Sequence, residues 1–253
     1  LTVSGFALNY ATPVGLMGGE PYRIMELTPY VGASKATSSV ILYVMMHIFS
    51  HFCFWFFSIF LYLALRPVDI AMGTILAVVG AVSLLAIYFF MKGYKNGMAV
   101  RTLKLLQHIP FIKEWAKRFS ENKREALERV DSQIAELHKQ RRSTFYASLS
   151  LEFMARIIGC LEVYFILNIL TTDVSFPACI LIMAFTSLFA NLFFFSPMQL
   201  GAREGGFALA VGGLAIPGAF GVYTGLITRV RELIWIVIGV LLMKVGNGTP
   251  ANK

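Results

Sequence analysis

The chain has 253 residues, of which 57% are apolar and only 14% are charged, and its formal net charge is +8. An average soluble domain carries roughly 25% charged residues, and a soluble protein of this length cannot bury so much apolar surface. The composition therefore excludes a disordered chain, argues against a soluble enzyme and indicates an integral membrane protein.

The first part of the chain predicts a membrane-embedded helical hairpin. The sequence opens at Leu1 within an apolar stretch, so we expect the membrane domain to be incomplete at this end. Segments 40–65 and 70–91 are each long and apolar enough to cross a bilayer as a helix. The short turn around Pro67 joins them.

Segment 92–143 is the hydrophilic part of the sequence. It holds 13 of the 22 lysines and arginines but only 6 of the 14 acidic residues. Such a bias marks cytoplasmic loops, and apolar residues at helical spacing predict an amphipathic helical insertion. Two interpretations stay open, an interfacial helix on anionic lipid and a helical hairpin packed on itself. Nucleic-acid binding is disfavoured because membrane spans flank the segment.

The second half of the chain predicts further membrane helices and one irregular stretch. Segments 145–170 and 174–195 form a third and a fourth span. Glycines and prolines interrupt 196–225, which predicts broken or re-entrant helices. A last helix is expected over 228–243, opening with Arg229, followed by a disordered tail at 244–253.

The third span carries charged residues inside an apolar segment. Glu152 and Arg156 are four residues apart, hence on one helix face, and can form a structural pair. Alternatively, Arg156 and Glu162 line a polar cavity, since an ionisable residue within a membrane is a functional candidate. Arg229 is the expected cation of the same cavity.

Two interrupted segments resemble each other. TPVGLMGGE (12–20) and SPMQLGARE (196–204) share the spacing of seven between a proline and a glutamate, and both contain glycine. An arginine lies close to each glutamate. The corresponding residues are Pro13, Gly19, Glu20 and Arg23 in the first segment, and Pro197, Gly201, Arg203 and Glu204 in the second.

The two segments predict a charged cavity between repeat halves. Proline and glycine free backbone groups that hydrocarbon tolerates only beside protein or water. An arginine could receive the anionic part of a head group, and a glutamate its amine. Two surface loops with ordinary charges are the competing interpretation.

These motifs resemble the lysylphosphatidylglycerol synthase transmembrane region, also called the flippase-like domain family. The similar stretches are GGEPYR (18–23), SPMQLGAREGG (196–206) and the run from Gly213 to Arg229. The resemblance implies a bacterial or archaeal polytopic domain that moves aminoacylated or other polar lipids between leaflets. The soluble aminoacyl-transferase domain of bifunctional members is absent from this sequence, so lipid synthesis is not implied.

The sequence thus predicts an all-α, polytopic integral membrane bundle with two broken-helix segments related by an internal repeat. We expect one flippase-like domain over 1–253, in the cytoplasmic membrane of a cell, with anionic or aminoacylated phospholipid as partner and a homo-oligomer left open. A secondary transporter of a small soluble solute is the alternative. No catalytic constellation, cofactor motif or third metal ligand beside His47 and His51 is apparent.

Overall fold

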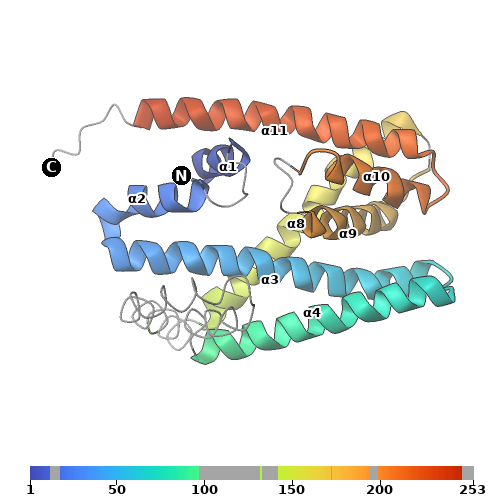
Figure 1. The fold of residues 1–253 in the computed structure, drawn as a ribbon, viewed down its shortest axis with the longest axis horizontal. Coiled ribbons are helices and arrows are strands. Elements are labelled where there is room, and N and C mark those ends of the chain that lie inside the picture. The colour runs from blue at the N-terminus through green and yellow to red at the C-terminus, as the bar shows by residue number, and fades with distance from the viewer. Residues whose placement is uncertain (12–17, 97–131, 133–141, 172, 194–198, 247–253) are drawn as a thin grey trace, which may run out of the picture. The chain divides into compact units, whose positions relative to one another are not determined.

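A computed structural model describes residues 1–11, 18–96, 132, 142–171, 173–193 and 199–246 of the chain. The described residues form helices and contain no strand (Figure 1). The helices follow one another as α1 Thr2–Ala11, α2 Gly19–Val31, α3 Ala33–Leu65, α4 Ile70–Asn96, α8 Arg142–Leu170, α9 Phe176–Leu192, α10 Ala202–Gly212 and α11 Gly218–Gly246. The predicted all-α fold class is confirmed. Most of the predicted insertion at 92–143 and residues 247–253 of the predicted tail lie outside the described residues. The described residues 92–96 are the end of α4, and 244–246 are the end of α11 and not a disordered tail.

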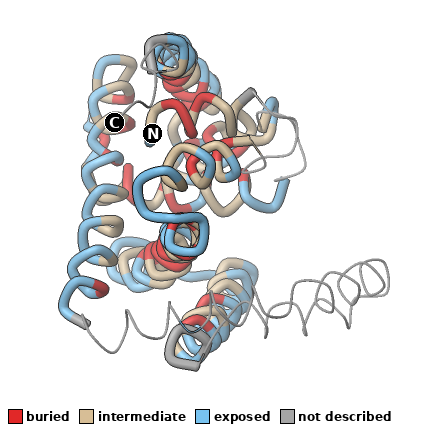
Figure 2. Tube along the Cα trace, turned by 90° about the vertical axis from the view of Figure 1, so that its left-hand side faces the viewer, coloured by how far each residue is buried: buried red, intermediate tan, exposed pale blue. Residues whose placement is uncertain are grey.

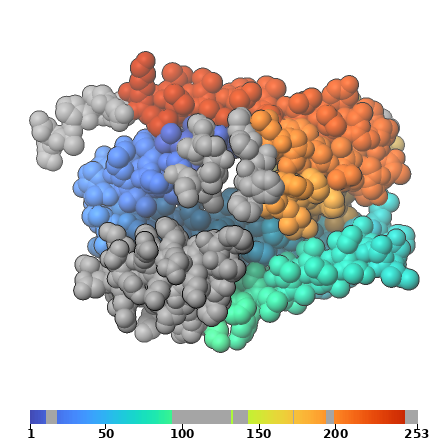
Figure 3. All heavy atoms as spheres, viewed as in Figure 1, coloured from blue at the N-terminus to red at the C-terminus, as the bar shows by residue number. Residues whose placement is uncertain are grey.

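Three helices are long and apolar enough to cross a membrane, within Ala33–Leu65, Ile70–Lys92 and Ser143–Leu170. They match the first three spans expected from the sequence, whereas the expected fourth span at 174–195 is a shorter apolar helix, Phe176–Leu192. Only 6% of the most apolar window of the second span is buried within the protein. In water such a surface would be very unfavourable, whereas in a bilayer lipid chains cover it. Side chains of α4 are visible on the face drawn in Figure 3. The chain is a multi-pass membrane protein.

The structure corrects the prediction for the last helix. This helix does not begin near Thr228 but at Gly218, so that Arg229 lies well inside a helix of 29 residues. Pro217 directly precedes its first turn, where the missing N–H of proline has no cost. The glycines that suggested a break at 218–225 are helical, and some of them allow another helix to come close, as described below. The described residues 193, 199–201 and 213–217 lie outside the α-helices.

The residues group into two compact units. The first comprises Leu1–Glu26, Phe57–Pro67 and Ala155–Lys253, and the second Leu27–Phe56 and Val68–Met154. Within the first unit, α10 packs on both α9 and α11, and α1 packs on α11 (Figure 1). Its apolar core consists of Val163, Leu167, Val174, Cys179, Ile182, Phe207 and Val211. Buried and exposed residues alternate along these helices, as Figure 2 shows, so each helix presents one face to the core.

The second unit has its own apolar core. Met46 and Phe49 of α3 pack with Phe90 of α4 and Phe145 of α8, and the rings of Phe49 and Phe90 are stacked with centroids 4.1 Å apart. In the same unit, His47 Nδ1 lies 3.4 Å from a carboxylate oxygen of Glu152. The structure therefore places Glu152 beside a histidine of α3.

Candidate functional site

Both motif glutamates lie in the first turn of a short helix. Glu20 follows Gly19 at the start of α2, and Glu204 is the third residue of α10, whose N-cap is Gly201. A carboxylate is favoured there because the helix dipole points its positive end at it. Each short helix follows another helix and precedes a long one, the order expected of an internal repeat. The repeat stays a prediction, because Pro13 and Pro197 lie outside the described residues.

The first motif builds a buried polar cluster between α1 and α2. Arg23 Nη1 donates to Glu20 Oε1 at 2.8 Å, and Asn9 Nδ2 donates to the same oxygen at 3.3 Å. The amide oxygen of Asn9 accepts from the backbone N–H of Gly19 at 2.8 Å, while Arg23 Nη2 reaches the carbonyl of Thr2 at 3.3 Å. Both charged side chains are nearly buried, with 10% and 13% of Arg23 and Glu20 exposed. The sequence had indicated Arg23 and Glu20 but not Asn9.

Two glycines allow this cluster to form. A Cβ atom on Gly5 would lie 2.5 Å from Arg23 Nε, and one on Gly19 would lie 2.2 Å from the carbonyl oxygen of Gly5. Real Cβ atoms do not come so close to backbone oxygens, so α1 and α2 can approach each other only with glycine at this position. Gly19 of the motif therefore has a packing role, whatever else the motif does.

The second motif forms an ion pair between α10 and α11. Arg229 Nε donates to Glu204 Oε1 at 2.7 Å, and Arg229 Nη2 lies 2.6 Å from the same oxygen. The other carboxylate oxygen accepts from the backbone N–H of Gly201 at 2.9 Å, as in a capping box. The exposed fractions of the two side chains are 12% and 15%. The expected cavity cation thus contacts the motif glutamate directly.

The surroundings of Glu204 favour its ionised form. Burial alone would raise the pKa of Glu204. Backbone N–H groups at the start of α10 and the Arg229 guanidinium outweigh this effect, so that the pKa lies below its ordinary value of 4.5. Because the folded pKa is lowered, the carboxylate contributes stability that is fully present above the unfolded pKa.

This contribution predicts how stability depends on pH. We expect the Glu204→Gln variant to be less stable than the native protein at neutral pH, and the difference to shrink as the pH falls below 4.5 through the folded pKa. The measurement is thermal unfolding of both proteins in detergent between about pH 3 and 7. A difference that stays constant over this range would mean that the charge of Glu204 does not stabilise the fold.

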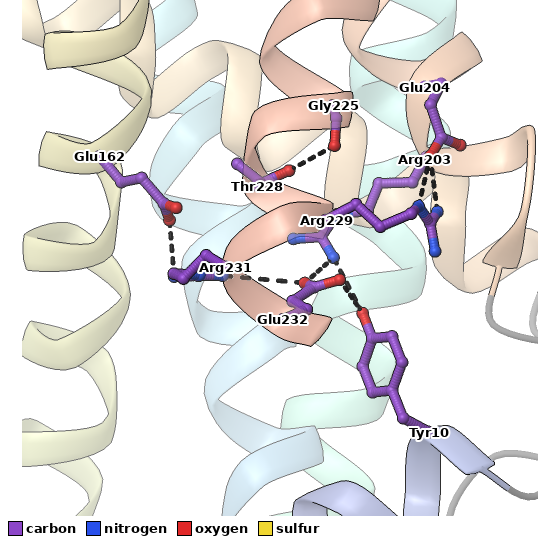
Figure 4. Close-up of polar contacts among 9 residues, drawn as sticks. All are labelled: Tyr10, Glu162, Arg203, Glu204, Gly225, Thr228, Arg229, Arg231 and Glu232. Atoms are coloured by element: carbon purple, nitrogen blue, oxygen red, sulfur yellow. Dashed lines mark hydrogen bonds and ion pairs between the residues drawn. The ribbon is translucent and has the colours of Figure 1, made fainter. Parts of the chain in front are cut away.

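A third cluster centres on Glu232 of α11 (Figure 4). Glu232 is 4% exposed, and its carboxylate accepts hydrogen bonds from the Tyr10 hydroxyl of α1 and from Arg203 Nη1 of α10. Arg203 Nη1 also donates to the Tyr10 hydroxyl at 3.1 Å. Burial raises the pKa of Tyr10, so its hydroxyl stays protonated and can donate. These three helices are therefore joined by one buried polar triangle.

Arg231 extends this cluster toward α8. Its Nη1 lies 2.6 Å from Glu162 Oε2, and its Nη2 lies 3.7 Å from Glu232 (Figure 4). The sequence offered no partner at helical spacing for Glu162, and the structure supplies one from another helix. Another predicted site residue, Arg156, is half-buried on α8, where its carbonyl oxygen accepts from Cys160 Sγ at 3.2 Å.

Sequence reasoning missed two members of the site. Tyr10 lies in the apolar stretch at the start of the sequence, and Glu232 lies three residues after Arg229; neither is among the residues that the sequence predicts for the site. Because α11 begins eleven residues before Arg229, the run Arg229, Arg231 and Glu232 lies in mid-helix. Three charges in the middle of an otherwise apolar helix require partners on other helices. That signal would have identified Glu232 if the helix start had been placed correctly.

The arrangement keeps opposite charges paired where water is scarce. Arg203, Arg229 and Arg231 each contact at least one of Glu162, Glu204 and Glu232. Removing one partner of a buried pair leaves an uncompensated charge, typically at a cost of about 3–5 kcal/mol. The same pairs can exchange partners with a zwitterionic or anionic group, because guanidinium binds phosphate and carboxylate in the same geometry. Across the described ranges, no three histidine, cysteine, aspartate or glutamate residues are grouped so that they could hold a metal ion.

Comparison with known proteins agrees with the resemblance seen in the sequence. No curated protein and no solved structure matches the chain significantly. Residues 1–239 match the family described as the Lysylphosphatidylglycerol synthase TM region. This match covers every described helix except the last turns of α11. The chain therefore belongs to the lysylphosphatidylglycerol synthase TM region family.

Proposed function

We propose that this protein moves a polar phospholipid, anionic or aminoacylated, between the leaflets of a cell's cytoplasmic membrane. The head group would cross along the paired charges of the first unit while the acyl chains stay in the bilayer. The observation that carries this proposal is the set of nearly buried arginine–glutamate pairs in a multi-pass membrane protein.

The energetic argument concerns the head group. Carrying a charge to the centre of a bilayer is costly, about 2.5–3.5 kcal/mol even on the most permissive scales. Arg229 and Arg203 can replace the water around a phosphate, and Glu204 and Glu232 can do so for an amine. In the present arrangement these groups satisfy one another, so the substrate competes with the ion pairs and the protein needs no unpaired buried charge between transport events.

The two motif clusters support a division of roles. The pair of Glu20 and Arg23 is held within α2 and tied to Asn9 and Thr2 of α1. The pair of Glu204 and Arg229 joins two separate helices, so it can open when they move apart. We assign head-group exchange to this second pair, and to the first pair the role of holding α1 against α2.

The test is lipid movement in vesicles that contain the purified protein. We expect the native protein to make aminoacylated phosphatidylglycerol, supplied in the inner leaflet, accessible to a membrane-impermeant amine reagent. Arg229→Gln should reduce the rate at least about tenfold, the effect of losing roughly 1.4 kcal/mol of head-group binding.

The reciprocal variant controls for folding. Exchanging the two residues, Arg229→Glu together with Glu204→Arg, keeps an ion pair between α10 and α11 but reverses its direction. We expect this variant to stay folded and to move lipid slowly. Native-like rates in both variants would reject the assignment of the pair. Uptake of a soluble solute without lipid movement by the native protein would instead favour a secondary transporter.

A further inference from the structure

One ion pair of the first unit differs from the others in its exposure. The side chain of Arg231 is 47% exposed and that of Glu162 is 26% exposed. By comparison, the side chains of Arg203 and Glu232 are 18% and 5% exposed. The charges therefore run from a half-exposed pair between α8 and α11 to a buried cluster, with Arg231 in contact with Glu232 at the inner end.

This exposed pair lies within an apolar surface. Glu162 is eight residues before the end of a helix that can span the membrane, or about 12 Å at the helical rise. Exposed apolar side chains precede and follow both charges along their helices: Ile158, Leu161 and Phe165 on α8, and Ile227, Val230, Leu233 and Ile234 on α11. Charged residues of membrane helices almost always face the protein interior, so the half-exposed guanidinium of Arg231 is suited to a polar partner in addition to Glu162.

We propose that Arg231 and Glu162 form a lateral docking site for the phosphate-bearing head group of an anionic phospholipid, with its acyl chains on the surrounding apolar side chains. This inference rests on the proposed function and gives the place where the lipid enters. Arg231 would bind the phosphate, and Glu162 would be the group that the phosphate displaces. From there, Glu232 and Arg203 continue the polar path inward.

The difference in exposure between Arg231 and Glu162 indicates that the bound head group is an anion. The cation is the more exposed group of the pair, so an anion reaches Arg231 before a cation reaches Glu162. A guanidinium has five N–H donors in a planar fork, and its contacts with two carboxylates leave donors that suit a phosphate. A zwitterionic choline head group has a phosphate too, but its bulky cation would have to fit beside the same guanidinium.

Trp235 provides a reporter for this site. It lies one helical turn after Arg231 and is 46% exposed. The chain has three tryptophans, so Trp55→Phe and Trp115→Phe leave it as the single one. In vesicles that mix lipids with brominated and ordinary chains, quenching of Trp235 measures which lipid adjoins it. We expect brominated phosphatidylglycerol to be preferred over brominated phosphatidylcholine.

Three substitutions in this single-tryptophan protein test the assignment. Arg231→Gln should lower the preference for phosphatidylglycerol about fivefold, the usual effect of one basic residue on anionic lipid. Glu162→Gln should raise the preference, because the competing carboxylate charge is gone. Lys244→Gln removes one charge from the last turn of the same helix and should change nothing. An unchanged preference in both site variants, or an equal loss with Lys244→Gln, would overturn the docking site.

Lipid movement is measured in the same vesicles so that the two proposals can fail separately. If the native protein moves no lipid but Trp235 keeps a preference that depends on Arg231, the docking site stands and the proposed function falls. If lipid moves and Arg229→Gln stops it while Arg231→Gln changes neither quenching nor rate, the function stands and the docking site falls.

Discussion

Replacing Glu232 by alanine is expected to lower the free energy of unfolding by about 3–5 kcal/mol. The change removes the acceptor shared by Tyr10 and Arg203, and it leaves the Arg203 guanidinium nearly buried without its carboxylate. The measurement is unfolding of the protein in mixed micelles by increasing amounts of a denaturing detergent. Lipid movement should be lost in the same variant, since the proposed inward path loses its central acceptor.

A double variant separates the effect of the charges of Arg203 and Glu232 from the effect of their side-chain volume. Arg203→Met together with Glu232→Met removes both charges and keeps most of the side-chain volume, so we expect it to recover most of the lost stability. It should not recover lipid movement. If the double variant is as unstable as Glu232→Ala, the ion pair itself stabilises the fold, and the loss in Glu232→Ala is not explained by an unpaired Arg203 alone. If Glu232→Ala had the stability of the native protein, Glu232 would not be the shared acceptor that holds Tyr10 and Arg203 in place.

Replacing Gly221 by alanine is expected to destabilise the contact of α10 with α11 by about 1–3 kcal/mol or more. A Cβ atom there would lie 2.5 Å from the carbonyl oxygen of Phe207 and 2.7 Å from the Cα atom of Ala208. Both contacts are with backbone atoms, so no side chain can turn away to relieve them. The helices would have to separate, and the pair of Arg229 and Glu204 would open with them.

Gly159 is the matched control for this experiment. It is also a helical glycine, but a Cβ atom on it would meet nothing within 4 Å. Gly159→Ala should therefore leave stability unchanged or raise it by up to about 1 kcal/mol, because alanine is the better helix former. Thermal unfolding of the two variants side by side measures the difference. Equal effects of both substitutions would mean that α10 and α11 are not held together by close backbone contact.

The glycines in the first turns of α11 also explain why the sequence predicts a start of this helix that is too late. Glycines at 218, 221 and 225 resemble a break when only helix propensity is considered. In the structure, Gly221 lies against the backbone of α10, and Gly225 against Glu204. The helix continues because close packing of two helices offsets the poor propensity of glycine. Only the neighbouring helix reveals this reason.

The sequence by itself determined the membrane character, the three long spans and the family of this protein, because these depend on length, apolar composition and short motifs. It also indicated the two motif glutamates, since they occupy matching positions in two similar segments interrupted by proline and glycine. Apart from Glu20 and Arg23, which pair within α2, the partners of the charges were decided by the tertiary structure alone. Tyr10 and Glu232 are 222 residues apart, and Glu162 meets Arg231 from a different helix. Such contacts depend on which helix faces which, and helical spacing within one segment carries no information about that.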